Sequence, residues 1–278
     1  GTSSLTVTGN FTLAAGMTRS FTGSITFNAT STGKQITLNG KTTDSSVTFN
    51  GSGGGWTVQD NWSNTTSSFT LSQGGLDTNG KTITGVSFSS TGSSVRSLTL
   101  GASTINLQSF SLSSTNLTFS AGTSTINVTT ATQPVFGGAG FTFNTVVLSA
   151  GANMSGANTF ATLTVDISAG PSKTLNWLLS SNITVTGTLT INGNSATNRL
   201  LVRAFTPGSA ITITAATVSA SYVDFMDITG AGAASWNLSA ITGGAGNAGG
   251  NTGITFTTPV NRYWVATSGG SWSATSSW

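Results

Sequence analysis

The chain of 278 residues contains no cysteine, no histidine and no glutamate. Without cysteine it can form no disulfide, use no thiol nucleophile and build no thiolate metal site. Without histidine it lacks the side chain that most often serves as general base and as metal ligand. We therefore expect no catalytic residue, no metal and no cofactor, and we expect packing and hydrogen bonding alone to stabilise the fold.

Charged residues are also scarce, at 5% of the chain against about 25% in an average soluble domain. The formal net charge is +3, and the nine basic residues are scattered, which is too dilute for a nucleic-acid-binding patch. No apolar run approaches the roughly 18 residues of a membrane span, and no signal peptide is visible. We therefore predict no nucleic-acid partner and no membrane span in this segment.

Good helix formers are rare, whereas serine, threonine, glycine and asparagine dominate the composition. Hydrophobic residues still make up 36% of the chain, enough to build a core, so the low charge does not indicate disorder. In segments such as Leu5–Val7, Ile25–Phe27 and Val47–Phe49, apolar residues alternate with threonine. This period of two is typical of half-buried strands. The composition and the pattern predict a folded all-β chain.

The strongest repeat is a phrase that occurs twice. Residues 98–107 read LTLGASTINL and residues 117–128 read LTFSAGTSTINV, so their Ser-Thr-Ile-Asn tetrads begin at Ser103 and Ser124. The tetrad Asn-Gly-Lys-Thr recurs at residues 39–42 and 79–82, close to two such steps apart. A period of about 20 residues, with short strands and no intervening helix, favours a solenoid of some fourteen rungs. A β-sandwich, which also has many short strands, remains the alternative.

The repeated phrase makes a specific prediction about stacking. If the two tetrads occupy successive rungs, Ile105 and Ile126 stack inside the core. Asn106 and Asn127 then lie one above the other on the outside, where their amides form a ladder.

A glycine run followed by two closely spaced tryptophans occurs at both ends of a longer interval. Trp56 and Trp62 form the first pair, and Trp272 and Trp278 form the second with the same internal spacing. The chain begins without Met and stops in mid-pattern, so we expect a fragment of a longer protein. We predict that residues 1–50 end a preceding solenoid section, 51–265 form the main module and 266–278 begin the next.

Aromatic side chains are candidates for contact with glycans, because a flat apolar face with a polar edge suits a sugar ring. The alternative is that these rings pack in the core where one module meets the next. The candidates are Trp56, Trp62, Tyr263, Trp264, Trp272 and Trp278.

Asp224 and Asp227 are the only close pair of carboxylates in the sequence. The apolar alternation slips between Phe225 and Met226, which predicts a bend with both aspartates pointing outward. Together with Arg203 they would be the residues of a polysaccharide lyase or hydrolase of the β-helix type. The alternative is that they are solvated charges, and a Ca²⁺ site would require six to eight oxygen ligands.

Thr-x-Thr pairs occur at many places in the chain, for example Thr82/Thr84, Thr162/Thr164 and Thr188/Thr190. Ice-binding solenoids present flat arrays of such pairs, with one pair on every rung in a constant register. The intervals between the pairs are irregular here, so we interpret them as ordinary outward-facing β-branched residues.

Three stretches carry a resemblance to a known group of proteins: TVTGTLTI at residues 184–191, the repeated phrases above and the tail RYWVATSGGSWSATSSW. Together they resemble repetitive right-handed β-helix surface proteins of the bacterial adhesin-like and phage-fibre type. The resemblance implies a single-stranded right-handed parallel β-helix (β-solenoid) whose rungs each contain about 20 residues. It also implies a structural or adhesive role at the cell surface, outside the cell or on a virion. The expected partners are neighbouring modules and surface glycans.

Overall fold

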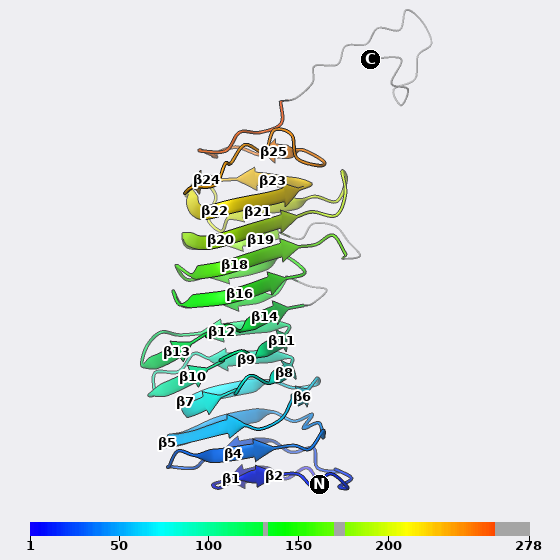
Figure 1. The fold of residues 1–278 in the computed structure, drawn as a ribbon, viewed down its shortest axis with the longest axis vertical. Coiled ribbons are helices and arrows are strands. Elements are labelled where there is room, and N and C mark those ends of the chain that lie inside the picture. Colours follow the sequence, from blue (N-terminus) through cyan, green and yellow to red (C-terminus); the bar gives the residue numbers. More distant parts are fainter. Residues whose placement is uncertain (130–132, 170–175, 259–278) are drawn as a thin grey trace, which may run out of the picture.

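The computed structural model describes residues 1–129, 133–169 and 176–258. These residues form no α-helix, and hence no helix that could cross a membrane. Their parallel strands wind into a β-solenoid of about 11 turns with roughly 22 residues per turn, stacked in one column (Figure 1). The predicted all-β solenoid is confirmed. The fourteen rungs predicted for the whole chain compare with about 11 turns in the described residues, where a turn contains roughly 22 residues against the predicted 20.

One sheet contains sixteen strands. Those in its N-terminal part are β1 (Leu5–Val7), β2 (Phe11–Thr12), β3 (Ile25–Phe27), β4 (Lys34–Thr37), β5 (Val47–Val58), β7 (Phe69–Asp77), β9 (Ser87–Ser90) and β10 (Arg96–Thr99). The remaining strands are β12 (Ser109–Leu112), β13 (Leu117–Ser120), β15 (Val135–Gly137), β17 (Ala152–Ser155), β19 (Asn176–Leu179), β21 (Leu200–Ala204), β23 (Val223–Met226) and β25 (Ala245–Asn247).

The second sheet contains nine strands and runs along a different side of the solenoid. Its strands are β6 (Trp62–Asn64), β8 (Thr82–Gly85), β11 (Thr104–Leu107), β14 (Thr125–Val128), β16 (Thr142–Leu148), β18 (Thr159–Asp166), β20 (Ile183–Asn192), β22 (Ile211–Ser221) and β24 (Ile228–Ala231).

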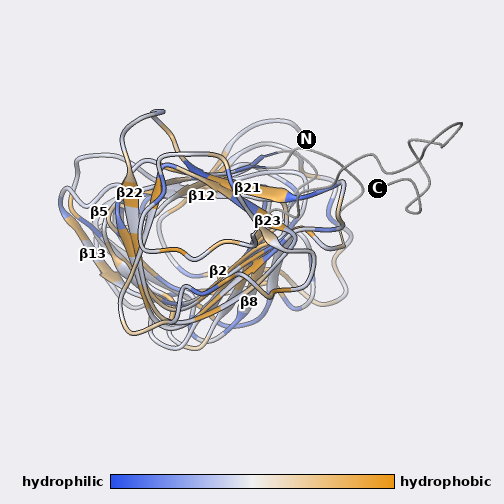
Figure 2. Ribbon diagram, turned by 90° about the horizontal axis from the view of Figure 1, so that it is seen from above, coloured by the Kyte–Doolittle hydropathy of each residue, from blue (hydrophilic) through white to orange (hydrophobic). Residues whose placement is uncertain are grey.

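Turn length varies while the register between most paired strands stays constant, with shifts in the pairings of β5 with β7, β18 with β20 and β20 with β22. Phe110 pairs with Phe136 and Phe136 pairs with Met154, although the first step is much longer along the chain than the second. A one-residue slip would turn every apolar side chain outward, so added residues are accommodated in the corners. The view along the axis shows the turns superposed as a ring, with loops extending outward from it (Figure 2).

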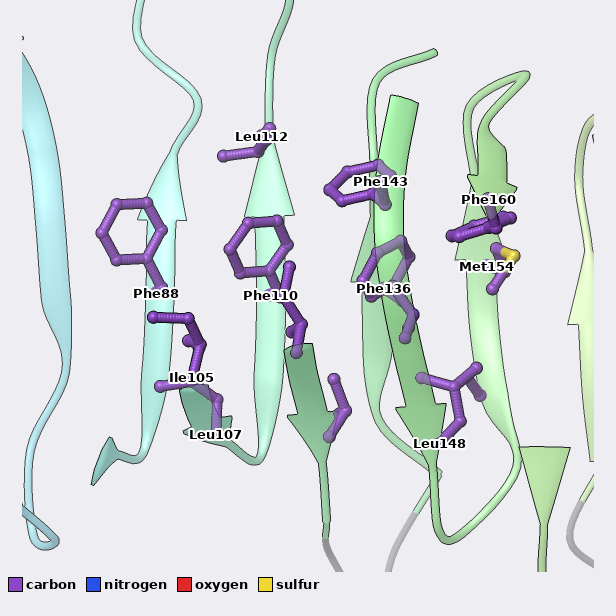
Figure 3. Packing of buried hydrophobic residues seen from close by; sticks show 14 of the residues in the cluster. Phe88, Ile105, Leu107, Phe110, Leu112, Phe136, Phe143, Leu148, Met154 and Phe160 are labelled. Atoms are coloured by element: carbon purple, nitrogen blue, oxygen red, sulfur yellow. The ribbon is translucent and has the colours of Figure 1, made fainter. Parts of the chain in front are cut away.

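Apolar side chains fill the inside of this ring in columns. The rings of Phe88, Phe110 and Phe136 stack with centroids 5.7 Å apart at each step (Figure 3). Phe143 and Phe160 form a second stacked pair at 5.6 Å. A fully buried side chain of this kind contributes about 1.5–3 kcal/mol, and each aromatic pair adds about 0.5–1.5 kcal/mol. The core therefore gains stability with every added turn.

The predicted stacking of the repeated phrase is confirmed. Ile105 pairs with Ile126 on the next turn, and both are buried. Asn106 pairs with Asn127, and the Asn127 Nδ2 donates to Asn106 Oδ1 at 2.8 Å. The two tetrads therefore occupy equivalent places on successive turns.

The repeated Asn-Gly-Lys-Thr tetrad forms a corner. Asn39 and Asn79 have φ values of 50° and 52°, and the glycine after each also has a positive φ. Asparagine and glycine are the residues that adopt this left-handed conformation at lowest cost. Each asparagine side chain also donates to a carbonyl of the turn below, Leu13 for Asn39 and Val58 for Asn79. The tetrad is thus a structural device that closes a turn.

Arg96 is the buried cation of the described chain, with 1% of its surface exposed. Its Nε donates to the Ser94 carbonyl at 3.0 Å, and its terminal nitrogens donate to Ser90 and to the carbonyls of Ser113 and Thr115. Burial lowers the pKa of the guanidinium. Because Ser113 and Thr115 belong to the following turn, this side chain ties two turns together.

We expect Arg96→Met to lower the free energy of unfolding by about 1–3 kcal/mol or more, because it leaves buried carbonyls without a donor. Urea unfolding followed by circular dichroism measures the change. Arg203→Met is the matched control: among the described residues that guanidinium donates only to the Ala204 carbonyl, at 3.2 Å, so we expect a change within about 0.5 kcal/mol. Equal effects of the two substitutions would contradict this role of Arg96.

Candidate functional site

Trp56 and Trp62 lie in the core, with 1% and 2% of their surfaces exposed. The Trp62 indole Nε1 donates to Thr43 Oγ1 at 2.8 Å, and its ring packs against Phe69. Neither ring offers a face to solvent, so the expectation that a glycan stacks on these two is wrong. Core packing, the alternative, accounts for both. The other four candidates, Tyr263, Trp264, Trp272 and Trp278, lie outside the described residues.

The glycines before Trp56 have a structural reason of their own. A Cβ on Gly51 or Gly54 would come within 2.0 Å of the Ala29 carbonyl oxygen on the turn below. Strand β5 (Val47–Val58) contains this stretch and runs across the predicted boundary between residues 50 and 51. The core continues through it without a break, while the division into modules stays a prediction.

Asp224 is held by Arg199. The Arg199 Nε lies 2.9 Å from both carboxylate oxygens. Its terminal nitrogens donate to the carbonyls of Val223, Gly243 and Gly244. These contacts join the turn of β21 to the two turns that follow, so the pair stabilises the C-terminal part of the solenoid.

Asp227 does not point outward as predicted. It has a φ of 56° and forms the corner between β23 and β24, with 6% of its surface exposed. Its Oδ2 accepts the backbone N–H of Gly208 at 2.8 Å. The predicted bend therefore exists but lies at Asp227, and Met226 stays on the outer side of β23. In the described residues no ion pair joins Arg203 to either aspartate.

Potential metal ligands do not cluster in the part of the chain that the structure describes. The two aspartates of the lyase hypothesis instead have different structural roles: Asp224 binds Arg199, and Asp227 closes a corner.

The outer face of the nine-stranded sheet carries two regular columns of side chains, all polar except Val147, which we call the threonine face. The register between strands places the same position of each turn directly above that of the last. The first column consists of Thr82, Thr104, Thr125, Thr145, Thr162, Thr188 and Thr217, where Thr162 and Thr188 directly precede the paired Leu163 and Leu189. The second column, two residues further along each strand, consists of Thr84, Asn106, Asn127, Val147, Thr164, Thr190 and Ser219.

Sequence reasoning missed this face because the intervals between its residues are irregular. The step along the chain from Thr145 to Thr162 is much shorter than the step from Thr188 to Thr217. The structure nevertheless places Thr82/Thr84, Thr162/Thr164 and Thr188/Thr190 at equivalent positions of one sheet, while the interpretation of the pairs as ordinary outward-facing residues stays a prediction. The extra residues lie mainly in corners and in the other sheet, and two register shifts within this sheet, before Leu163 and before Thr188, take up the rest.

Most hydroxyls of the first column have no hydrogen-bond partner in the described protein. Only Thr145 has one, the Asn144 side chain, at 3.3 Å. Serines at or just before strands of the other sheet behave differently: Ser24 donates to Ser4 at 2.8 Å, and Ser87 donates to Ser68 at 2.7 Å. These threonines are half-buried or exposed, so their hydroxyls are available to water.

A third, more polar column borders the threonine face. Asn192 donates to Asp166 Oδ2 at 3.1 Å and accepts from the Ser221 hydroxyl at 3.0 Å. Partial burial raises the pKa of Asp166, but hydrogen bonds from Ser168 and Asn192 outweigh it and lower the pKa below its usual value. These hydrogen bonds hold the carboxylate in the third column.

No protein-family model, curated protein or solved structure matches the chain. The structure by itself defines a parallel β-solenoid.

We expect Arg199 and Asp224 to be coupled by about 1–3 kcal/mol, the value of hydrogen bonds between charged groups. A double-mutant cycle with Arg199→Met and Asp224→Asn, measured by urea unfolding, gives this energy. Strictly additive effects of the two substitutions would show that the pair contributes nothing beyond its separate side chains.

We expect Asp166 to make the protein more sensitive to acid. Because its folded pKa lies below the unfolded value of about 3.9, its ionised form stabilises the fold above that pH. This contribution is lost as the pH falls through the lower, folded pKa. The thermal midpoint of wild type should therefore fall more steeply below pH ~4 than that of Asp166→Asn. Parallel curves would contradict the assignment.

Proposed function

We propose that this chain is a structural and adhesive β-solenoid segment of an extracellular, cell-surface or virion-surface fibre. It contacts glycans or proteins through its flat outer faces and is not an enzyme. The observation that carries the proposal is the threonine face, an outward array kept in register over seven successive turns.

Rigidity supports this role. Each inner turn is hydrogen-bonded to the turns above and below it, and one core runs from Leu13 to Ala245. With strands about 4.8 Å apart, 11 turns give a rod on the order of 50 Å long. A rod of this kind holds its surface groups at fixed spacings.

The hollows of the surface differ in size. One of about 360 Å³ lies at the N-terminal end and is lined by Phe11 and Met17, among others. Another, of about 170 Å³, opens on the threonine face itself and is lined by Thr84, Asn106 and Gln108, among others. Sites for small ligands usually measure about 300–1,000 Å³, so the hollow on the threonine face is too small for one and favours contact across the face.

The charged side chains also favour a non-catalytic role. Arg199 and Asp224 are bound to each other, and Asp227 accepts a backbone N–H at a corner. A lyase or hydrolase of the β-helix type would need these groups free to reach a substrate.

Two assays on the intact protein test the proposal. Beads coated with mucin, chitin or polygalacturonate are incubated with the protein, and the retained protein is measured. The same mixtures are assayed for new unsaturated or reducing ends. We expect retention on at least one surface and no released ends.

Two outcomes would overturn the proposal. Released ends that disappear in Asp224→Ala would make the chain a polysaccharide-cleaving enzyme. Failure to bind any coated bead would remove the adhesive role.

A further inference from the structure

We propose that the threonine face binds ice. The inference rests on the proposed contact function and names the partner of one face: the planar lattice of water molecules at an ice surface.

The geometry of the face is that of a two-dimensional lattice. Neighbouring rows are set about 4.8 Å apart by the backbone ladder, and the two columns are two residues, about 6.6–6.8 Å, apart along each strand. Seven rows therefore extend on the order of 30 Å along the axis. Binding a single small ligand does not require a constant spacing between rows. A crystalline partner does require it, because it presents the same repeat at every row.

The columns of the threonine face stay aligned even where the length of a turn changes. The pairing of β18 with β20 shifts register between Phe160 and Leu163, and the pairing of β20 with β22 shifts between Val185 and Thr188. These irregularities lie just before the first column. A bulge absorbs an extra residue and re-aims the side chains that follow, so the threonines return to their column.

The chemistry of the side chains suits water. A hydroxyl offers one donor and two acceptors, and those of Thr82, Thr104 and Thr125 have no partner in the described protein. Threonine is also restricted in χ1 because it is β-branched. Its hydroxyl and methyl groups therefore hold their positions before binding, which reduces the entropy lost when water molecules become ordered around them.

Charge and aromatic rings are absent from both columns of the threonine face. A charged group would organise its own hydration shell in place of a lattice. Stacking on sugar rings would require aromatic side chains. The nearest carboxylate, Asp166, lies in the bordering column and is engaged by Asn192.

In most rows the residue between the two columns is buried. Ile105, Ile126 and Val146 are between 0% and 3% exposed, so each row is anchored from below. Val147 replaces a polar residue in the second column without interrupting the register. Its methyl groups have the volume of a threonine side chain and preserve the surface shape.

The test measures thermal hysteresis and inhibition of ice recrystallisation by the intact chain, and the incorporation of fluorescently labelled protein into a growing ice crystal. The variant is Thr125→Tyr, which places a bulky ring in the middle of the threonine face. The matched control is Thr48→Tyr: Thr48 lies at a half-buried outward position of β5, on the other sheet. Circular dichroism establishes that both variants are folded, and Thr162→Tyr replaces Thr125→Tyr if the latter is not.

We expect wild type and Thr48→Tyr to show equal hysteresis and incorporation, and Thr125→Tyr to lose both. Absence of hysteresis in the wild type at high concentration would overturn ice binding. Equal loss in both tyrosine variants would also overturn the assignment to this face.

The same variants separate this inference from the proposed function. Retention on mucin, chitin or polygalacturonate beads without hysteresis would leave the adhesive role intact and make a glycan the partner. Dimers of the wild type that Thr125→Tyr abolishes would make a second copy the partner. Either outcome, without hysteresis, rejects ice.

Discussion

The parallel backbone ladder between successive turns is the constraint on which this structure depends. Each strand pairs in register with the strands above and below it, and a slip of one residue would exchange core and surface side chains. The phenylalanine columns inside and the threonine columns outside are both consequences of that register. Corners, where Asn39 and Asn79 adopt left-handed conformations, absorb the differences in turn length.

Several of the few charged side chains connect successive turns through hydrogen bonds. Arg96 supplies donors to carbonyls of two turns, and Arg199 joins Asp224 to carbonyls further along the solenoid. With these groups engaged, the outer faces present mostly hydroxyls and amides. On our proposal, the threonine face recognises a periodic surface by spacing and shape.

Much of the fold could be predicted from the residues, because alternation and period report directly on strands and turns. The stacking of Ile105 on Ile126 follows from a local phrase that repeats almost unchanged. Other features could not be predicted. Trp56 looks suited to a sugar ring until its inward position on β5 is known, and Asp227 looks exposed until its corner conformation is known.

By itself the sequence determined an all-β solenoid without disulfides, with apolar residues inside and hydroxyls outside. It could do so because the alternation within strands and the longer period of the turns can both be read directly from the order of residues. Only the tertiary structure decided which hydroxyls lie together. Thr145, Thr162 and Thr188 are separated by unequal intervals in the chain, yet the ladder places them in one column. Spatial register depends on where each corner places its extra residues, and the linear spacing does not contain that information.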